Sequence, residues 1–216
     1  MSSKSKLFFE KSRLAEKFGS SKFSGSPEKY GLEKFISDET YKTYANQIIS
    51  GLYLGDINSA NDLDWLKSQK ITNILGMIDG QIKHPGMNYL IHGNILDHPD
   101  ENIVKYFGSC YQFISNALSK NERVLVHCYA GISRSTTIVV MYLMYSHKLK
   151  LLQALEFVSK RRSVACPNFG FQLQLQIFEG LSDDKKTELL FKENKDEENN
   201  ENDKDEEVDS EDAVPQ

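Results

Sequence analysis

One short segment constrains this chain more than any other, because it holds a cysteine and an arginine at a fixed spacing. The segment reads His127-Cys128-Tyr129-Ala130-Gly131-Ile132-Ser133-Arg134-Ser135. Before it, residues 123–127 form a short apolar run with β-branched side chains, which predicts a buried strand. After it, residues 136–145 form an apolar run too long for a buried strand, which predicts a core helix. We therefore expect Cys128 at the end of a strand and Arg134 at the start of a helix.

This placement suits the binding of a phosphate group against a thiolate. Backbone N–H groups at a helix N-terminus have no partners within the helix and attract anions. Gly131 lets the loop backbone adopt a positive φ and approach a ligand closely. The guanidinium of Arg134 can bind two phosphate oxygens at once, and the positive field favours the thiolate form of Cys128. This chemistry needs no metal ion and no other cofactor. The alternative is a buried cysteine beside an unrelated arginine.

The motif His-Cys-x-x-Gly-x-x-Arg resembles the signature of cysteine-dependent protein tyrosine phosphatases. Ala130, Ser133 and Ser135 make it similar to the dual-specificity branch of that family in particular. The resemblance implies an enzyme that hydrolyses phosphate esters through a covalent phosphocysteine intermediate on Cys128.

Two further segments extend the resemblance along the chain. Residues 49–55 look like the opening strand of the dual-specificity branch, and residues 167–175 are similar to its closing helix. The resemblance runs from about residue 47 to residue 181. It implies an α/β fold, a protein-tyrosine-phosphatase-like mixed sheet flanked by helices, in a single domain with flexible termini. The chain is then an atypical, stand-alone member of the branch.

The residues around Cys128 have expected roles. Phosphate binding is assigned to Tyr129, Ala130, Gly131, Ile132, Ser133 and Arg134. Ser135 is expected to donate a hydrogen bond to the departing thiolate; the alternative is a serine that satisfies backbone groups in the first helical turn. The resemblance implies that His127 positions the loop by hydrogen bonding. Asn168 is expected either to cap the next helix or to support the loop of the general acid.

A general acid must protonate the leaving oxygen, because an alkoxide or phenoxide leaves poorly. Asp97 is the best candidate, because it follows an apolar run and precedes a helix-like segment. In the family this acid lies ten residues before a helical phenylalanine, and Asp97 has that relation to Phe107. Asp100 is the rival, and both carboxylates could instead cap the following helix.

The side chains of the catalytic loop bear on the substrate. The variable positions Tyr129, Ala130, Ile132 and Ser133 carry no charge, which favours one phosphate on a protein side chain. The resemblance implies phosphotyrosine and phosphoserine or phosphothreonine as substrates. Two alternatives remain open, a phosphoprotein-binding module with little turnover and a phosphatase of a non-protein phosphate such as RNA, glucan or lipid. Expected partners are phosphorylated proteins, with a protein kinase as a further candidate, and neither nucleic acid nor stable membrane insertion is expected.

Composition limits where such a chain works. The 216 residues are 39% hydrophobic, which is enough for one sizeable domain. The odd number of cysteines, three, with no signal peptide, predicts a reducing compartment, the cytoplasm or the nucleus. Cys166 is a candidate redox partner of Cys128 or a packed residue, and Cys110 is expected in the core.

Charge and hydropathy divide the chain into three parts. Residues 1–46 are predicted to be an N-terminal extension, partly flexible, with basic and apolar residues that suit a docking arm. Residues 47–182 are the predicted catalytic domain. From residue 183 to the end the chain holds fifteen acidic and five basic residues, which predicts an acidic, disordered tail over 183–216.

Hydrophobic patterning predicts the elements of the domain. Strands are predicted at residues 47–54, 71–77, 88–95 and 123–127, and helices at residues 59–69, 102–119, 134–146, 151–161 and 169–181. The basic run Lys160-Arg161-Arg162 ends one of these helices, where positive charge suits the helix dipole. It is also a candidate site for acidic residues of a substrate.

Overall fold

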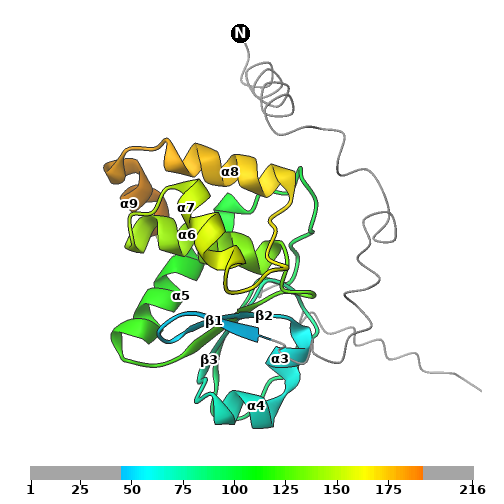
Figure 1. Ribbon diagram of the computed structural model, residues 1–216. Helices are drawn as coiled ribbons and strands as arrows, with labels where there is room; N and C mark the ends of the chain where they lie inside the picture. The colour runs from blue at the N-terminus through cyan, green and yellow to red at the C-terminus, as the bar shows by residue number, and fades with distance from the viewer. Residues whose placement is uncertain (1–44, 192–216) are drawn as a thin grey trace, which may run out of the picture. The chain divides into compact units, whose positions relative to one another are not determined.

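The computed structural model describes residues 45–191, which build a mixed α/β fold around one sheet (Figure 1). The sheet has five strands in the order β1-β2-β5-β3-β4. Their bounds are β1 (Ala45–Ile49), β2 (Leu52–Gly55), β3 (Asn73–Gly76), β4 (Asn88–Ile91) and β5 (Val124–His127). Only the β1–β2 pair is antiparallel; the other three pairs are parallel. The predicted mixed sheet is therefore confirmed, with β5 at its centre.

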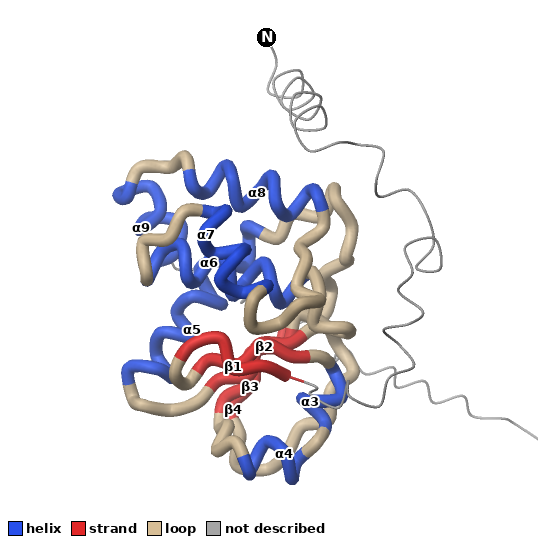
Figure 2. Tube along the Cα trace, viewed as in Figure 1, coloured by secondary structure: helices blue, strands red, loops and turns tan. Residues whose placement is uncertain are grey.

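Helices cover both faces of the sheet (Figure 2). Their bounds are α3 (Ile57–Asn61), α4 (Leu63–Ser68), the 3₁₀ turn η3 (Val104–Tyr106), α5 (Phe107–Ser119), α6 (Arg134–Ser146), α7 (Leu151–Ser159), α8 (Phe169–Glu179) and α9 (Asp183–Phe191). The five longer helices lie on one face, and α3 and α4 lie on the other. Alternate side chains of β5 pack on opposite faces of the sheet. Val124 and Val126 belong to the larger hydrophobic core, and Leu125 belongs to the smaller one. Both faces are thus buried, as is usual for parallel strands.

The single strand predicted at residues 47–54 is wrong, because the chain reverses inside it. β1 and β2 form an antiparallel hairpin whose turn contains Ser50 and Gly51. Gly51 has a φ of +80°, and a Cβ there would lie 2.8 Å from Leu118 Cδ2. Both the positive φ and the close neighbour require glycine at this position. Gly51 is therefore the residue that indicates a turn within the run at residues 47–54.

The helix predicted at residues 59–69 is divided into α3 and α4. Asp62 has extended backbone angles and caps α4 by accepting a hydrogen bond from Trp65 N at 2.9 Å. Asp56 caps α3 in the same way through Ser59 N at 2.8 Å. A short polar side chain that satisfies backbone N–H groups starts a new helix, and two such caps give two short helices.

Several other elements are shorter than predicted, and two of them flank the segment that carries Asp97. β4 ends at Ile91 and not at residue 95, because it pairs only with β3, whose last residue, Gly76, faces Ile91. The helix expected over 102–119 starts with the 3₁₀ turn, and the α-helix begins at Phe107. The strand loses its pairing partner, and the segment that follows is free to form the loop that carries Asp97.

The acidic segment predicted to be disordered from residue 183 begins with helix α9, so that part of the prediction is wrong. Leu190 is fully buried in the main core, and its carbonyl accepts a hydrogen bond from Gln112 Nε2 of α5 at 2.8 Å. The prediction from charge overlooked the apolar pair Leu189 and Leu190, which packs the helix against the main core. The packed part of the chain therefore extends to Phe191.

The remaining terminal predictions lie outside the described residues. Of the extension predicted at residues 1–46, which includes the proposed docking arm, residues 1–44 lie there, and the rest of the acidic tail falls on residues 192–216. Ala45 and Asn46 instead belong to β1, so the predicted boundary at residue 46 is two residues too late. Within residues 45–191, no helix has the length and apolar character needed to cross a membrane.

Candidate active site

The loop after β5 carries the candidate nucleophile. β5 ends at His127, Cys128 follows it, and α6 begins at Arg134. Gly131 has a φ of +65°, and a Cβ there would lie 2.4 Å from Gly55 O and 2.6 Å from Arg162 Nη2. Only glycine fits this position, and its conformation curls the loop at the N-terminus of α6.

Cys128 is 1% exposed and hydrogen-bonded at its sulfur. The hydroxyl of Ser135, in the first turn of α6, donates to Cys128 Sγ at 3.2 Å. This is the contact expected of a group that stabilises a thiolate, and Ser135 is itself fully buried. The structure thus places the candidate nucleophile and the candidate donor together, whereas sequence alone also allowed a serine bound only to the backbone.

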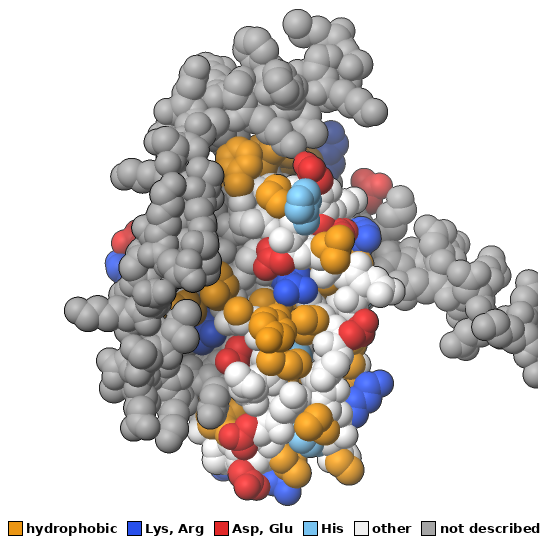
Figure 3. Space-filling model, turned by 90° about the vertical axis from the view of Figure 1, so that its right-hand side faces the viewer, with side chains coloured by type: hydrophobic (Ala, Val, Ile, Leu, Met, Phe, Trp, Pro, Cys, Tyr) orange, Lys and Arg blue, Asp and Glu red, His pale blue; other side chains and the backbone are white. Residues whose placement is uncertain are grey.

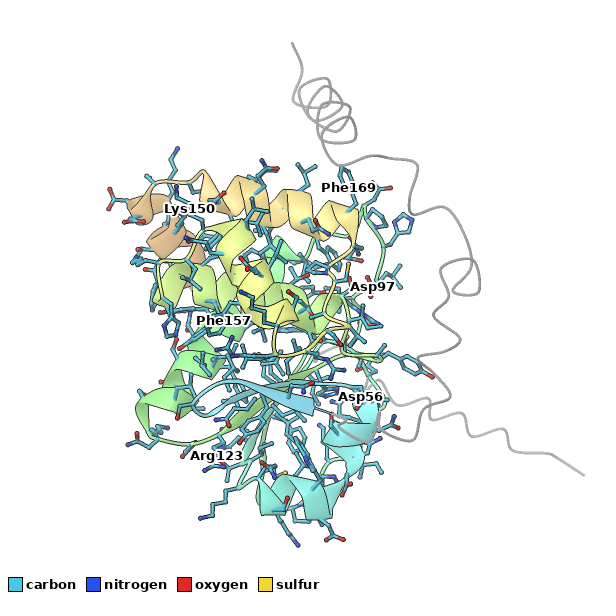
Figure 4. The ribbon with its side chains drawn as sticks, in the orientation of Figure 1. Asp56, Asp97, Arg123, Lys150, Phe157 and Phe169 are labelled. Carbon is cyan, nitrogen blue, oxygen red and sulfur yellow. The ribbon has the colours of Figure 1, made fainter. Side chains whose placement is uncertain are left out.

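Asp97 lies beside the catalytic loop and is held there by its neighbours (Figure 4). Its Oδ1 accepts hydrogen bonds from Ser133 Oγ at 2.7 Å and from Asn168 Nδ2 at 2.8 Å. Its Oδ2 lies 3.6 Å from Arg134 Nε. The rival carboxylate, Asp100, has a side chain that is 72% exposed and lies 3.9 Å from His98 Nδ1. Asp97 is thus bonded to the loop that carries the cysteine, which favours it over the more exposed Asp100 as the acid.

Ser133 has a role that sequence reasoning missed. Its hydroxyl donates to Asp97 and accepts from Asn168 N at 3.0 Å. The side chain is therefore a bridge between three segments, although the sequence suggested only a phosphate-binding position. No sequence pattern could identify this role, because the two partners lie 36 and 35 residues away.

Asn168 fills both of the roles that the sequence left open. Its Oδ1 caps α8 by accepting a hydrogen bond from Phe171 N at 3.0 Å. Its Nδ2 donates to Asp97. An amide side chain has separate donor and acceptor atoms, so the cap and the support of the acid do not compete.

The guanidinium of Arg134 is held by the segment that carries Asp97. Nη1 donates to Ile95 O at 3.1 Å. Nε is buried, makes no hydrogen bond among residues 45–191, and lies 3.6 Å from Asp97 Oδ2. A guanidinium held in this way at a helix N-terminus can bind oxygens of a tetrahedral dianion.

His127 is buried and uncharged near neutral pH. Burial lowers its pKa to about 4, although the backbone hydrogen bond to Cys128 and the charge of Asp56 act in the opposite direction. Nδ1 lies 3.4 Å from Cys128 O, a carbonyl that can only accept, so Nδ1 carries the proton. The imidazole is thus suited to hold the backbone of the cysteine, as the resemblance implied.

Arg162 is the second residue whose role sequence reasoning missed. It is 7% exposed, and it donates to two carbonyls of the catalytic loop: Nε to Gly131 O at 2.8 Å and Nη2 to Ala130 O at 3.2 Å. Nη1 donates to Asn46 Oδ1 at 2.9 Å. The expectation that this arginine faces acidic substrate residues is therefore wrong, because its donors are directed at the loop. Burial lowers the pKa of its guanidinium, with Asp56 and Cys128 opposing the shift.

The other cysteines lie apart from this chemistry. Cys110 is fully buried, as expected, and burial raises the pKa of its thiol. Cys166 is exposed, and its N–H donates to Ile132 O at 2.8 Å. All three cysteines are free thiols, and a redox pairing of Cys166 with Cys128 stays a prediction. Residues 45–191 contain no group of three or more His, Cys, Asp or Glu side chains suited to a metal ion.

Comparisons with known proteins agree with this geometry. Residues 52–180 match the family model described as "Dual specificity phosphatase, catalytic domain". Dual specificity protein phosphatase 1B of Arabidopsis thaliana is 40% identical over 136 residues, which cover 62% of this chain and 81% of the relative.

Solved structures give the same result. The crystal structure of DUSP15 matches with a TM-score of 0.64 and 37% identity, covering 68% of this chain and 94% of that chain. The crystal structure of human tyrosine phosphatase-like serine/threonine/tyrosine-interacting protein matches with a TM-score of 0.60 and 35% identity. The match covers 62% of this chain and 95% of that chain.

The sheet, the loop that carries the cysteine and the neighbouring carboxylate together define the chain as a cysteine-dependent phosphatase. Within that class, the chain belongs to the dual-specificity phosphatase catalytic-domain family, since the family model spans more than half of its residues. Members of this family hydrolyse phosphoproteins through a phosphocysteine, and this chain is a dual-specificity protein phosphatase.

Proposed function

We propose that Cys128, Asp97, Arg134 and Ser135 carry the phosphatase reaction of this chain in the roles of nucleophile, general acid, phosphate clamp and thiolate donor. The observation that carries this assignment is the hydrogen bond from Ser133 Oγ to Asp97 Oδ1 at 2.7 Å. It joins the candidate acid to the loop that begins at the nucleophile, so both groups face one bound phosphate.

The first step transfers the phosphoryl group to sulfur. The thiolate of Cys128 attacks phosphorus and forms the S–P bond, while the bond from phosphorus to the substrate oxygen breaks. Asp97 gives its proton to that oxygen, which leaves as a neutral phenol or alcohol. Backbone N–H groups of residues 129–134 and the guanidinium of Arg134 stabilise the charge on the phosphoryl oxygens.

The second step restores the enzyme. Water attacks phosphorus and gives a proton to the Asp97 carboxylate, and the S–P bond breaks to release inorganic phosphate. The hydroxyl of Ser135, 3.2 Å from the sulfur, stabilises the departing thiolate. His127 and Arg162 act as positioning residues, because their bonds are to backbone carbonyls of the loop.

The substrates that fit this site are single phosphates on tyrosine, serine or threonine side chains of proteins. The variable side chains of the loop are uncharged, so the loop offers no lysine to a second phosphate of an inositol lipid. A phosphorylated protein kinase is one candidate substrate and partner. The cytoplasm or the nucleus is the proposed compartment, on the basis of the free thiols.

A binding module with little turnover is the second candidate function. One structural neighbour bears the name of a tyrosine phosphatase-like interacting protein. In this chain the cysteine, the arginine and the acid are all present in bonded positions, which favours turnover over capture.

The test is turnover of an aryl phosphate, with Cys128→Ser as the control. We expect hydrolysis by the natural sequence and none above background by the variant. A protein that binds phosphopeptides but hydrolyses neither them nor the aryl phosphate would be a binding module. A panel of phosphotyrosine peptides, phosphothreonine peptides and phosphoinositides then identifies the substrate class, and faster turnover of the lipid than of both peptides would contradict the proposal.

A further inference from the structure

Large apolar side chains are exposed around the catalytic loop. Leu96 is 68% exposed, Tyr129 66%, Phe169 42% and Ile132 38%. They are four of the eight large hydrophobic side chains exposed among residues 45–191. Half of the large hydrophobic side chains exposed in the described domain thus belong to three short segments, two loops and the start of α8. We call these four residues the mouth surface.

Each member of the mouth surface is next in sequence to a residue of the site. Leu96 precedes Asp97, Tyr129 follows Cys128, Ile132 precedes Ser133 and Phe169 follows Asn168. Hydrogen bonds join these neighbours to one another: Ser133 and Asn168 both donate to Asp97. The four apolar side chains therefore belong to segments that are bonded together beside Cys128.

Figure 4 shows Asp97 between Phe169 and Asp56 along one edge of the molecule. Figure 3, which faces this edge, shows hydrophobic side chains grouped around a basic one, with acidic side chains nearby.

The charged groups beside the mouth surface are bonded to one another or to the loop. Asp97 accepts hydrogen bonds from Ser133 and Asn168 and lies 3.6 Å from Arg134 Nε. Arg162 donates to carbonyls of the catalytic loop. A large apolar residue beside the phosphorylated one would cover the mouth surface and remove apolar area from water.

We infer that this phosphatase selects phosphorylated protein segments in which the residues next to the phosphorylated one are large and apolar. The inference rests on the proposed function and specifies its substrate class. The occupant of the mouth surface is then the substrate chain itself, because the surface is continuous with the catalytic loop.

The experiment compares two phosphotyrosine peptides that differ only in the residues flanking the phosphotyrosine, leucine and phenylalanine in one and glutamine and asparagine in the other. The measured quantity is the ratio of kcat/KM for the apolar peptide to kcat/KM for the polar peptide. We expect a ratio of about ten, the equivalent of about 1.4 kcal/mol. Because the flanking residues of both peptides are uncharged, raising the salt concentration should leave the ratio nearly unchanged.

Three variants test the surface itself. Leu96→Ser and Phe169→Ser should each bring the ratio several-fold closer to one. Leu152→Ser is the matched control, because Leu152 in α7 is 67% exposed and its near neighbour Lys150 lies at the opposite edge of Figure 4 from Phe169. This control should keep the ratio of the natural sequence. Because each ratio compares two substrates of one protein, a general loss of activity in a variant cancels.

The outcomes separate this inference from the proposed function. If the protein hydrolyses an aryl phosphate but prefers the polar peptide, or shows no preference, the inference is wrong and the proposed function stands. A ratio that survives both mouth variants also overturns it. Specific activity that falls as protein concentration rises, and recovers in the Leu96→Ser variant, would assign the surface to a second copy of the chain. Absence of aryl phosphate turnover would instead contradict the proposed function.

Discussion

Asp97 is held by side chains from two other segments, and this arrangement distinguishes it from Asp100. We expect Asp97→Asn to lower kcat by about 10²–10⁴-fold on phosphotyrosine substrates, because the phenoxide then leaves without a proton. The loss should shrink for aryl phosphates with more acidic leaving groups, which need no proton. Measuring kcat against the pKa of the leaving group checks this, with Asp100→Asn as the control. A larger loss in the Asp100 variant would reverse the assignment.

Arg162 holds the outer side of the catalytic loop through Ala130 O and Gly131 O. We expect Arg162→Met to lower kcat/KM by about tenfold to a hundredfold, because a small displacement of the phosphate-binding groups is costly. Arg162→Lys keeps the charge but cannot reach both carbonyls in the planar geometry of arginine, so it should restore only part of the activity.

The matched control for Arg162 is its neighbour. Arg161 is exposed, and its guanidinium lies 3.5 Å from the centre of the Phe157 ring. Arg161→Met should leave kcat/KM nearly unchanged. If both methionine variants lost kcat/KM equally, the hydrogen bonds from Arg162 to the loop carbonyls would not be what positions the catalytic loop.

His127 makes the stability of the protein depend on pH. Its pKa is about 4 when folded and 6.5 as an ordinary histidine, so the unfolded chain binds a proton between these values that the folded protein does not. The stabilisation from the neutral imidazole is complete above pH 6.5 and is lost as the pH falls towards 4, by at most about 3 kcal/mol. Urea unfolding at pH 7 and at pH 4.5 should show a smaller drop for His127→Asn than for the natural sequence. Because His147 is exposed, a His147→Asn variant should keep the full drop.

At the scale of elements, helix α9 shows how an acidic composition can conceal a packed segment. We expect Leu190→Ala to lower the free energy of unfolding by about 2–5 kcal/mol, since it removes a fully buried side chain from the main core. Glu188→Ala, on the exposed side of the same helix, should change it by less than about 0.5 kcal/mol. Chemical denaturation measures both. If Leu190→Ala left the free energy of unfolding unchanged, α9 would not belong to the cooperative unit.

The elements were predictable where the pattern was long or sharply bounded. The bounds of α6 agree with the helix predicted at 134–146, because a long apolar run follows a loop with a defined start. The hairpin of β1 and β2 was not predictable from hydropathy, because both strands are apolar and only Gly51 separates their patterns. Asp62 and Asp56 show the same limit in α3 and α4: a cap is visible in sequence only if the turn before it is already known.

At the scale of the whole molecule, the site is built from segments that are distant in sequence. The candidate nucleophile and its loop could be predicted from the sequence, because Cys128, Gly131 and Arg134 lie within seven residues. The bridge made by Ser133 and the support from Arg162 could not be predicted, because each depends on a contact that spans more than thirty residues. Local chemistry can be inferred from a motif, whereas the groups that position it depend on the fold.

The most direct test of the central claim is to isolate the covalent intermediate. Rapid acid quenching of the enzyme during turnover of an aryl phosphate, followed by mass spectrometry of its peptides, locates any phosphoryl group on the chain. We expect the mass of one phosphoryl group on the peptide that contains Cys128, and its absence from the Cys128→Ser variant. A phosphoryl group on another residue, or steady turnover by that variant, would contradict the assignment of Cys128 as the nucleophile.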